Sequence, residues 1–129
     1  MKENIIKEKS FNFAVRIVKL CKYLNTEKRE FLISKQLMRS GTSIGANTRE
    51  AQNAESKLDF IHKLGIAQKE ADETCYWLEL LNATDYLSTL EFDSIYKDSL
   101  ELIKLLRTII IRTKKNINLS SDKKLITDN

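Results

Sequence analysis

The chain of 129 residues is long enough for one domain with its own hydrophobic core, and its formal net charge is +4. Average usage would give roughly six prolines and nine glycines at this length, whereas the sequence has no proline and three glycines. The turn residues of a β-rich fold are therefore missing, and long helices are favoured. No apolar run approaches the roughly 18 residues that cross a bilayer, and no signal-peptide core is present. We expect a cytoplasmic protein without membrane contact.

The first predicted helix runs from Ser10, a reasonable N-cap, to about Asn25, after a polar segment 1–9 that we expect to be frayed. Its apolar residues recur at helical spacing over a wide surface and are Phe11, Phe13, Val15, Ile17, Val18, Leu20 and Leu24. The opposite arc holds Arg16, Lys19 and Lys22, with no acidic residue between Ser10 and Asn25. A purely basic outer face is predicted.

A second helix is predicted from about Lys28 to Ala54, and its middle is unusually rich in small residues. These are Ser40, Gly41, Ser43, Gly45 and Ala46. Each glycine inside a helix costs about 1 kcal/mol relative to alanine, so the pattern needs a physical reason. Close approach of another helix backbone is the favoured reason, and a local break in the helix is the alternative. Ile33, Leu37, Ile44 and Ala51 are expected to point inward.

Two further helices are predicted to begin at capping boxes, one at Ser56 with Asp59 and one at Ser88 with Glu91. They should run to about Asn82 and Lys115. The inward residues, spaced by three and four, are Phe60, Leu64, Ala67, Ala71, Thr74, Leu78 and Leu81, then Phe92, Ile95, Ser99, Leu102, Leu106 and Ile109. Short connections imply an all-α, antiparallel up-down-up-down four-helix bundle over residues 1–116. Residues 117–129 lack periodicity and are expected to form a disordered tail.

Polar residues at steps of three or four form a stripe on the second helix, and the third helix carries matching groups. The members are Gln36, Arg39, Ser43, Asn47 and Glu50, with Lys63, Glu70, Glu73 and Trp77. Arg39 or Lys63 could pair with Glu70 or Glu73 between the helices. The favoured interpretation is a network that fixes helix register or subunit contacts, and the alternative is a small ligand groove.

Motifs that suggest catalysis or metal binding lack their partners. Gly41-Thr42-Ser43-Ile44-Gly45 matches the hydrolase pattern G-x-S-x-G, but that pattern needs a preceding strand. His62 is the single histidine, and a helical di-metal site needs one from each of two helices. Cys21 and Cys75 show no redox or zinc spacing and are expected to be reduced core residues. We predict no enzyme activity, no metal and no cofactor.

Basic residues cluster again near the end of the fourth helix, at Arg107, Arg112, Lys114 and Lys115. Cations there also complement the helix dipole, which explains some of them. The first, third and fourth helices show more apolar surface than one bundle buries, which predicts a homo-oligomer. If an oligomer repeats both basic clusters, its field would attract nucleic-acid phosphates. Ordinary solvated helix faces are the alternative.

The run from Ser34 to Asn47, followed by Glu50-Ala51, resembles the signature of the bacterial four-helix bundle proteins named after the 23S rRNA intervening sequence. Further landmarks agree in order and spacing over residues 10–115, namely Ser10-Phe11, Phe13-Ala14, Ser56, Asp59-Phe60, Lys63, Ile66-Ala67, Lys69-Glu70, Glu73-Thr74 and Tyr76-Trp77-Leu78. The resemblance implies a ring-shaped homopentamer, similar also to accessory proteins of diversity-generating retroelements, which bind nucleic acid and a reverse transcriptase. It implies no reaction. RNA or DNA binding is the expected function, and a scaffold for a protein partner is the alternative.

Overall fold

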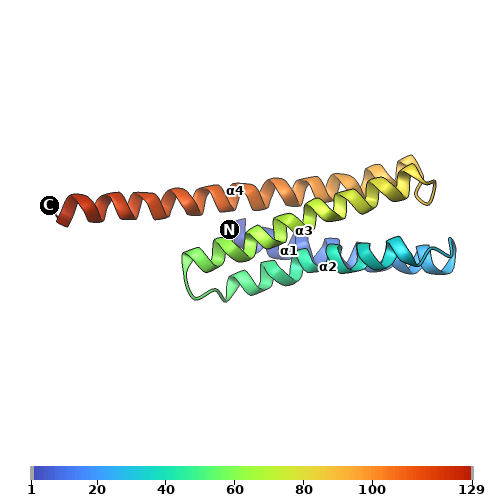
Figure 1. Cartoon of the computed structure of the whole chain (residues 1–129), viewed down its shortest axis with the longest axis horizontal. Coiled ribbons are helices and arrows are strands. Elements are labelled where there is room, and N and C mark those ends of the chain that lie inside the picture. The colour runs from blue at the N-terminus through green and yellow to red at the C-terminus, as the bar shows by residue number, and fades with distance from the viewer. Residues whose placement is uncertain (1, 129) are drawn as a thin grey trace.

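The computed structural model describes the backbone of residues 2–128 and the side chains of residues 4–119. Its elements are α1 (Lys2–Thr26), α2 (Leu32–Gln52), α3 (Lys57–Ala83) and α4 (Thr89–Asp128). The four helices lie side by side, and α4 projects well past the other three (Figure 1). The predicted all-α four-helix bundle is confirmed. None of the described helices is both long and apolar enough to cross a membrane.

Residue pairs across the seams show that neighbouring helices run antiparallel. The pairs are Lys9–Glu101 and Arg16–Asp98 between α1 and α4, Arg39–Glu73 and Glu50–Lys63 between α2 and α3, and Cys75–Ser99 and Glu79–Tyr96 between α3 and α4. In each seam, residues with higher numbers on the first helix pair with residues with lower numbers on the second helix. Because α1 also packs on α2, the helices follow one another around the bundle and alternate in direction.

The core contains most of the residues that were expected to point inward. Those that are almost completely buried include Phe13, Ile17, Leu24, Leu37, Ile44, Leu64, Leu78, Leu102 and Leu106. Leu20, Ile33, Phe60 and Phe92 are only partly buried and pack against this core from its margin. Helical periodicity therefore identified the inward face of each helix correctly.

Both cysteines are buried and free. The Cys21 thiol donates a hydrogen bond to the carbonyl of Ser34 at 3.3 Å. Burial, together with the nearby Glu30 carboxylate, raises the pKa of Cys21 to about 11. Burial also raises the pKa of Cys75, whose sulfur lies 3.2 Å from the hydroxyl of Ser99. Both residues are therefore core thiols, as the sequence predicted.

Gly41 and Gly45 lie where α1 and α2 come closest together. A Cβ atom at Gly45 would stand 3.3 Å from the backbone oxygen of Ser10, and one at Gly41 would stand 2.7 Å from Cγ1 of Ile17. The helix is continuous from Leu32 to Gln52. The predicted close approach is confirmed, and the alternative of a local break in this helix is wrong.

The substitution Gly41→Ala should therefore destabilise the fold, although alanine favours helix. Ile17 is fully buried and β-branched, so it cannot move away from a new methyl group without disturbing the core. We expect a loss of about 1 kcal/mol in the free energy of unfolding, measured by urea denaturation at fixed protein concentration. Ser43→Ala, on the same helix but away from this contact, should change little. A Gly41→Ala protein as stable as the wild type would show that Ile17 does not confine this position.

The prediction of a frayed segment before a helix start at Ser10 is wrong. The helix α1 already begins at Lys2, and Ile6 is 1 % exposed. Ser10 lies inside the helix, is buried, and donates its hydroxyl to the carbonyl of Lys7 at 3.1 Å. Ile6 precedes Phe13 by seven residues, so it continues the inward stripe of α1 by two turns.

Two adjacent isoleucines test whether this segment belongs to the core. Ile6 is buried, whereas Ile5 is 42 % exposed. Ile6→Ala should lower the free energy of unfolding by about 2–4 kcal/mol because it leaves a cavity, and Ile5→Ala should change it by less than about 1 kcal/mol. Thermal and urea denaturation of both variants will measure the difference. Equal effects would show that residues 2–9 are not packed as described.

The helix α2 begins at Leu32, later than the predicted start near Lys28, because Glu30 caps it. The Glu30 carboxylate accepts hydrogen bonds from the amides of Leu32 and Ile33, at 2.9 and 3.0 Å, and from that of Ser34 at 2.7 Å. A carboxylate at this position also complements the helix dipole. The preceding residue, Arg29, has a φ of 54°, which turns the chain sharply before the helix.

The predicted capping box at Ser88 is complete, and the one at Ser56 is present in its serine half. The Asp59 carboxylate accepts from the Glu55 amide at 3.4 Å rather than from that of Ser56. The Ser56 hydroxyl accepts a hydrogen bond from the Asp59 amide at 3.0 Å. Ser88 and Glu91 bond one another reciprocally, amide to side chain, at 3.1 Å. The starts of α3 and α4 were therefore predicted within a residue, because a capping box is a local signal that tertiary contacts do not override.

The predicted end of the last helix near Lys115 is wrong. The backbone of α4 stays helical to Asp128, through most of the segment 117–129 for which a disordered tail was expected. Figure 1 shows this part of α4 extending alone beyond the end of the bundle. The division of the chain into a bundle over residues 1–116 and a separate tail stays a prediction.

Candidate functional site

The predicted polar stripe lies along the seam between α2 and α3. Arg39 forms ion pairs with Glu70, at 3.2 Å, and with Glu73. The indole nitrogen of Trp77 donates to the same Glu73 carboxylate at 3.3 Å. The expectation that Arg39 pairs with acidic residues of the third helix is confirmed. Beneath these groups, the buried hydroxyls of Thr74 and Ser40 bond one another at 2.9 Å.

Other members of the stripe have partners that the sequence did not indicate. Lys63 pairs with Glu50 at 3.3 Å rather than with Glu70 or Glu73, because the antiparallel register places it opposite the end of α2. Ser43 donates to the carbonyl of Arg39 at 2.6 Å, and the Asn47 amide donates to the carbonyl of Ser43 at 2.9 Å. Gln36 is exposed. The ion pairs of Arg39 and Lys63 therefore link the two helices, whereas the bonds of Ser43 and Asn47 stay within α2.

Arg39 is expected to control the protonation of Glu73. Its hydrogen bond is the main reason that the pKa of Glu73 is lowered, and the indole of Trp77 acts in the same direction. Arg39→Gln should therefore raise the pKa of Glu73 toward its ordinary value, which carboxyl NMR titration can follow. Lys63→Gln, which removes the neighbouring pair with Glu50, should leave the pKa of Glu73 unchanged.

The lowered pKa of Glu73 makes the stability of the fold depend on pH. A carboxyl group whose pKa is lower in the folded state than in the unfolded state stabilises the fold at any pH above its unfolded-state pKa. This contribution is lost as the pH falls through the folded-state pKa. The wild type should therefore lose more stability than Arg39→Gln when pH is lowered through the glutamate range. An unchanged Glu73 titration in Arg39→Gln would contradict the assignment.

The structure divides the predicted basic residues between two distant regions. Lys19 and Lys22 are exposed on α1, and Lys19 shares a groove with Leu90 and Glu91 at the start of α4. Arg107, Arg112, Lys114 and Lys115 are exposed on α4 toward its projecting end. At about 1.5 Å per residue, the span from Glu91 to Arg112 is about 30 Å. One chain therefore does not bring the two clusters together.

The purely basic outer face predicted for the first helix is wrong at Arg16. Its guanidinium forms an ion pair with Asp98 of α4 and donates to the hydroxyl of Ser94 at 2.9 Å. The charge of Arg16 is thus largely compensated, whereas Lys19 and Lys22 are exposed. The acidic partner lies 82 residues away in the sequence, so no local pattern could reveal it.

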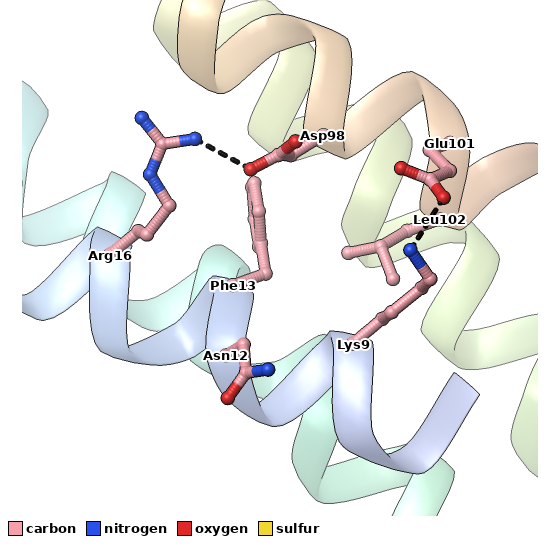
Figure 2. Close-up of a pocket in the computed structure, with 7 residues that line it drawn as sticks. All are labelled: Lys9, Asn12, Phe13, Arg16, Asp98, Glu101 and Leu102. Carbon is pink, nitrogen blue, oxygen red and sulfur yellow. Dashed lines mark hydrogen bonds and ion pairs between the residues drawn. The ribbon is translucent and has the colours of Figure 1, made fainter. Parts of the chain in front are cut away.

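Arg16 also lines a cleft between α1 and α4 that no sequence pattern indicated. Figure 2 shows Phe13 and Leu102 between two ion pairs, Arg16–Asp98 and Lys9–Glu101, the latter at 2.7 Å. The cleft has a volume of about 220 Å³. The hydrogen bond and charge of Glu101 raise the pKa of Lys9. Because its charged groups neutralise one another, this cleft offers no net charge to a ligand.

The residues of the catalytic and metal-binding motifs are not assembled into a reactive site. Ser43 lies inside a continuous helix rather than after a strand, and His62 is exposed on α3. Among the described residues, no group of three or more histidine, cysteine, aspartate and glutamate side chains could hold a metal ion. The features that remain are surfaces: the two basic clusters and the exposed apolar faces.

The family model described as 23S rRNA-intervening sequence protein matches residues 2–108. The chain belongs to this family. A crystal structure from Bacteroides thetaiotaomicron, described as a protein of unknown function from the S23 ribosomal protein family, is similar to it with a TM-score of 0.84 and 59 % identity. That similarity covers 85 % of this chain and 98 % of the other. No curated protein matches the chain.

The family match confirms the resemblance seen in the sequence and agrees with the corrected start of α1. It begins at residue 2 and so includes the segment that was expected to be frayed. It ends at residue 108, before Arg112, Lys114 and Lys115. Most of the basic cluster on α4 therefore lies outside the part of the chain that the 23S rRNA-intervening sequence family model describes.

Proposed function

We propose that this chain is a non-enzymatic homo-oligomer, pentameric as the family resemblance implies, that binds RNA or DNA through basic residues on its surface. The observation that carries the proposal is the pair of exposed basic clusters. One contains Lys19 and Lys22, and the other contains Arg107, Arg112, Lys114 and Lys115. Only an extended polyanion could contact both clusters of one chain across about 30 Å.

The arrangement favours recognition of phosphates over recognition of bases. Arg107 and Lys114 are seven residues apart, and Arg112 and Lys115 are three apart, so the two pairs line different sides of α4. Cations around an exposed helix attract a flexible or curved backbone without fixing one base register. Arg16, which is paired with Asp98, contributes less than its neighbours Lys19 and Lys22.

A scaffold for another protein is the second candidate function, and exposed apolar side chains favour it. Phe11 is 55 % exposed and Leu90 is 84 % exposed. Exposed apolar surface of this kind marks protein interfaces more often than nucleic-acid sites. A stoichiometric protein partner that stays bound after nuclease treatment would support this function over the first.

Charge reversal tests the nucleic-acid proposal. Fluorescence anisotropy of labelled structured RNA and duplex DNA, with nuclease-treated protein at several salt concentrations, should show saturable binding that weakens steeply with salt. The pairs Lys19→Glu/Lys22→Glu and Arg112→Glu/Lys114→Glu should each weaken binding by about tenfold or more and reduce the salt slope by about 2.

The matched control is Lys97→Glu/Lys104→Glu, which reverses two exposed charges elsewhere on α4. It should change binding less than either test pair, and all three variants should keep the wild-type mass in solution. No binding of either nucleic acid at low salt would reject the proposal and leave the scaffold function. Equal losses in the control and test pairs would show non-specific attraction by net charge rather than binding at these clusters.

A further inference from the structure

A hollow lies on the outer side of the α1–α2 seam. Its volume is about 330 Å³, and it is lined by Phe11, Ala14, Thr42, Gly45, Ala46, Arg49 and Glu50. Phe11 forms one wall, and the Arg49 guanidinium lies 6.0 Å from the centre of its ring. The hollow exists because the opposite residues are small where the two helices meet. We call this surface the α1–α2 face.

The charge around the α1–α2 face selects the kind of partner that it can bind. The lining of the hollow contains one basic and one acidic residue, Arg49 and Glu50, and the Glu50 carboxylate already pairs with Lys63 of α3 at 3.3 Å. Arg49 is exposed and is therefore the cation that this face offers to a partner. Two copies meeting through this same face would place like charges together, which is unfavourable. A partner surface should therefore combine an apolar side chain with acidic groups.

The outer side of α3 has those properties. Leu58, Gly65, Asp72 and Tyr76 are spaced by seven, seven and four residues, so they follow one side of the helix, which we call the α3 outer face. Leu58 is 70 % exposed and Tyr76 is 56 % exposed. The helix carries three basic residues, His62 and five acidic residues. This surface is thus apolar, aromatic and weakly acidic.

Gly65 gives an independent indication that something approaches the α3 outer face closely. A Cβ atom at Gly65 would meet nothing within 4 Å, in contrast to Gly41 and Gly45, which face α1. A glycine inside a helix costs about 1 kcal/mol relative to alanine. Contacts within the chain explain that cost for Gly41 and Gly45 but not for Gly65. Close approach of a second backbone would explain it.

We infer that the α1–α2 face of one copy binds the α3 outer face of the next. Tyr76 would enter the hollow beside Phe11, Asp72 would approach Arg49, and Gly65 would let the two backbones come close. This inference rests on the homo-oligomer in the proposed function and names its interface. Because the two faces differ, the contact is heterologous and generates a ring when its rotation closes.

Two single substitutions each block one face. Ala46→Gln fills the hollow on the α1–α2 face, and Gly65→Gln places a long side chain on the α3 outer face. Glutamine favours helix and adds no charge, so each variant should fold, which circular dichroism and thermal denaturation will check. Each variant alone should sediment as a monomer under conditions in which the wild type assembles.

A one-to-one mixture of the two variants gives the decisive measurement. The Ala46→Gln copy keeps an intact α3 outer face, and the Gly65→Gln copy keeps an intact α1–α2 face. The mixture should therefore form dimers with one copy of each, and no larger species. Lys97→Gln and Lys104→Gln, at exposed positions of α4, are controls that should keep the wild-type mass.

A charge exchange provides a second test that does not depend on side-chain size. Arg49→Glu should weaken assembly, and adding Asp72→Arg in the same chain should restore it, because the exchanged charges meet again between neighbouring copies. Failure of the second change to restore assembly would overturn the proposed placement of Asp72 against Arg49.

The outcomes separate this inference from the proposed function. If the wild type assembles but either glutamine variant keeps its mass, or the mixture stays monomeric, the assigned faces are wrong and the oligomer stands. If the wild type is itself a monomer, both the oligomer in the proposed function and this interface are wrong. Nucleic-acid binding by a monomeric glutamine variant would show that the basic clusters act without the interface.

Discussion

The close packing of α1 on α2 is the contact that positions the other surfaces of the bundle. At Gly41 and Gly45 the two helices approach until no Cβ atom would fit without movement of Ile17 or contact with the Ser10 backbone. This contact fixes the rotation of α1 about its axis. Arg16 then faces Asp98 of α4, and Phe11 is left exposed beside small residues of α2. The close packing of α1 on α2 therefore determines both the ion pair between α1 and α4 and the exposed surface around Phe11.

Charged groups at the seams select register more than they add stability. The ion pairs of Lys9, Arg16, Arg39 and Lys63 lie at partly exposed positions, where solvent screens them and the gain is small. A shift of one turn along α2 or α3 would separate Lys63 from Glu50, whereas Arg39, which pairs with both Glu70 and Glu73, could keep one of its partners. The apolar core lacks this selectivity, because leucine and isoleucine can pack in several registers.

Local signals and long-range contacts explain which parts of the structure were predictable. Capping boxes at Ser56 and Ser88 and the three-four spacing of apolar residues depend on nearby residues, so the helices, the core and two helix starts followed from the sequence. Ile5 and Ile6 are the only apolar residues between Lys2 and Lys9, too few to show a helical spacing, so the first two turns of α1 were not predicted. The pairing of Arg16 with Asp98 depends on how α1 meets α4, and no pattern within either helix specifies it.

The proposed assembly and the proposed nucleic-acid binding would be coupled by the positions of the basic clusters. A single copy presents two modest basic clusters that lie about 30 Å apart, and each alone would hold a polyanion weakly. In a ring, every copy repeats both clusters, so one continuous polyanion meets many cations at once and binding is strengthened by multivalency. The interface inferred for α3 uses the acidic part of the chain and leaves Lys114 and Lys115 outside it. Because that contact buries a cation, Arg49, against an anion, Asp72, it changes the net charge of the remaining surface little, and the basic residues at the end of α4 stay available to a nucleic acid.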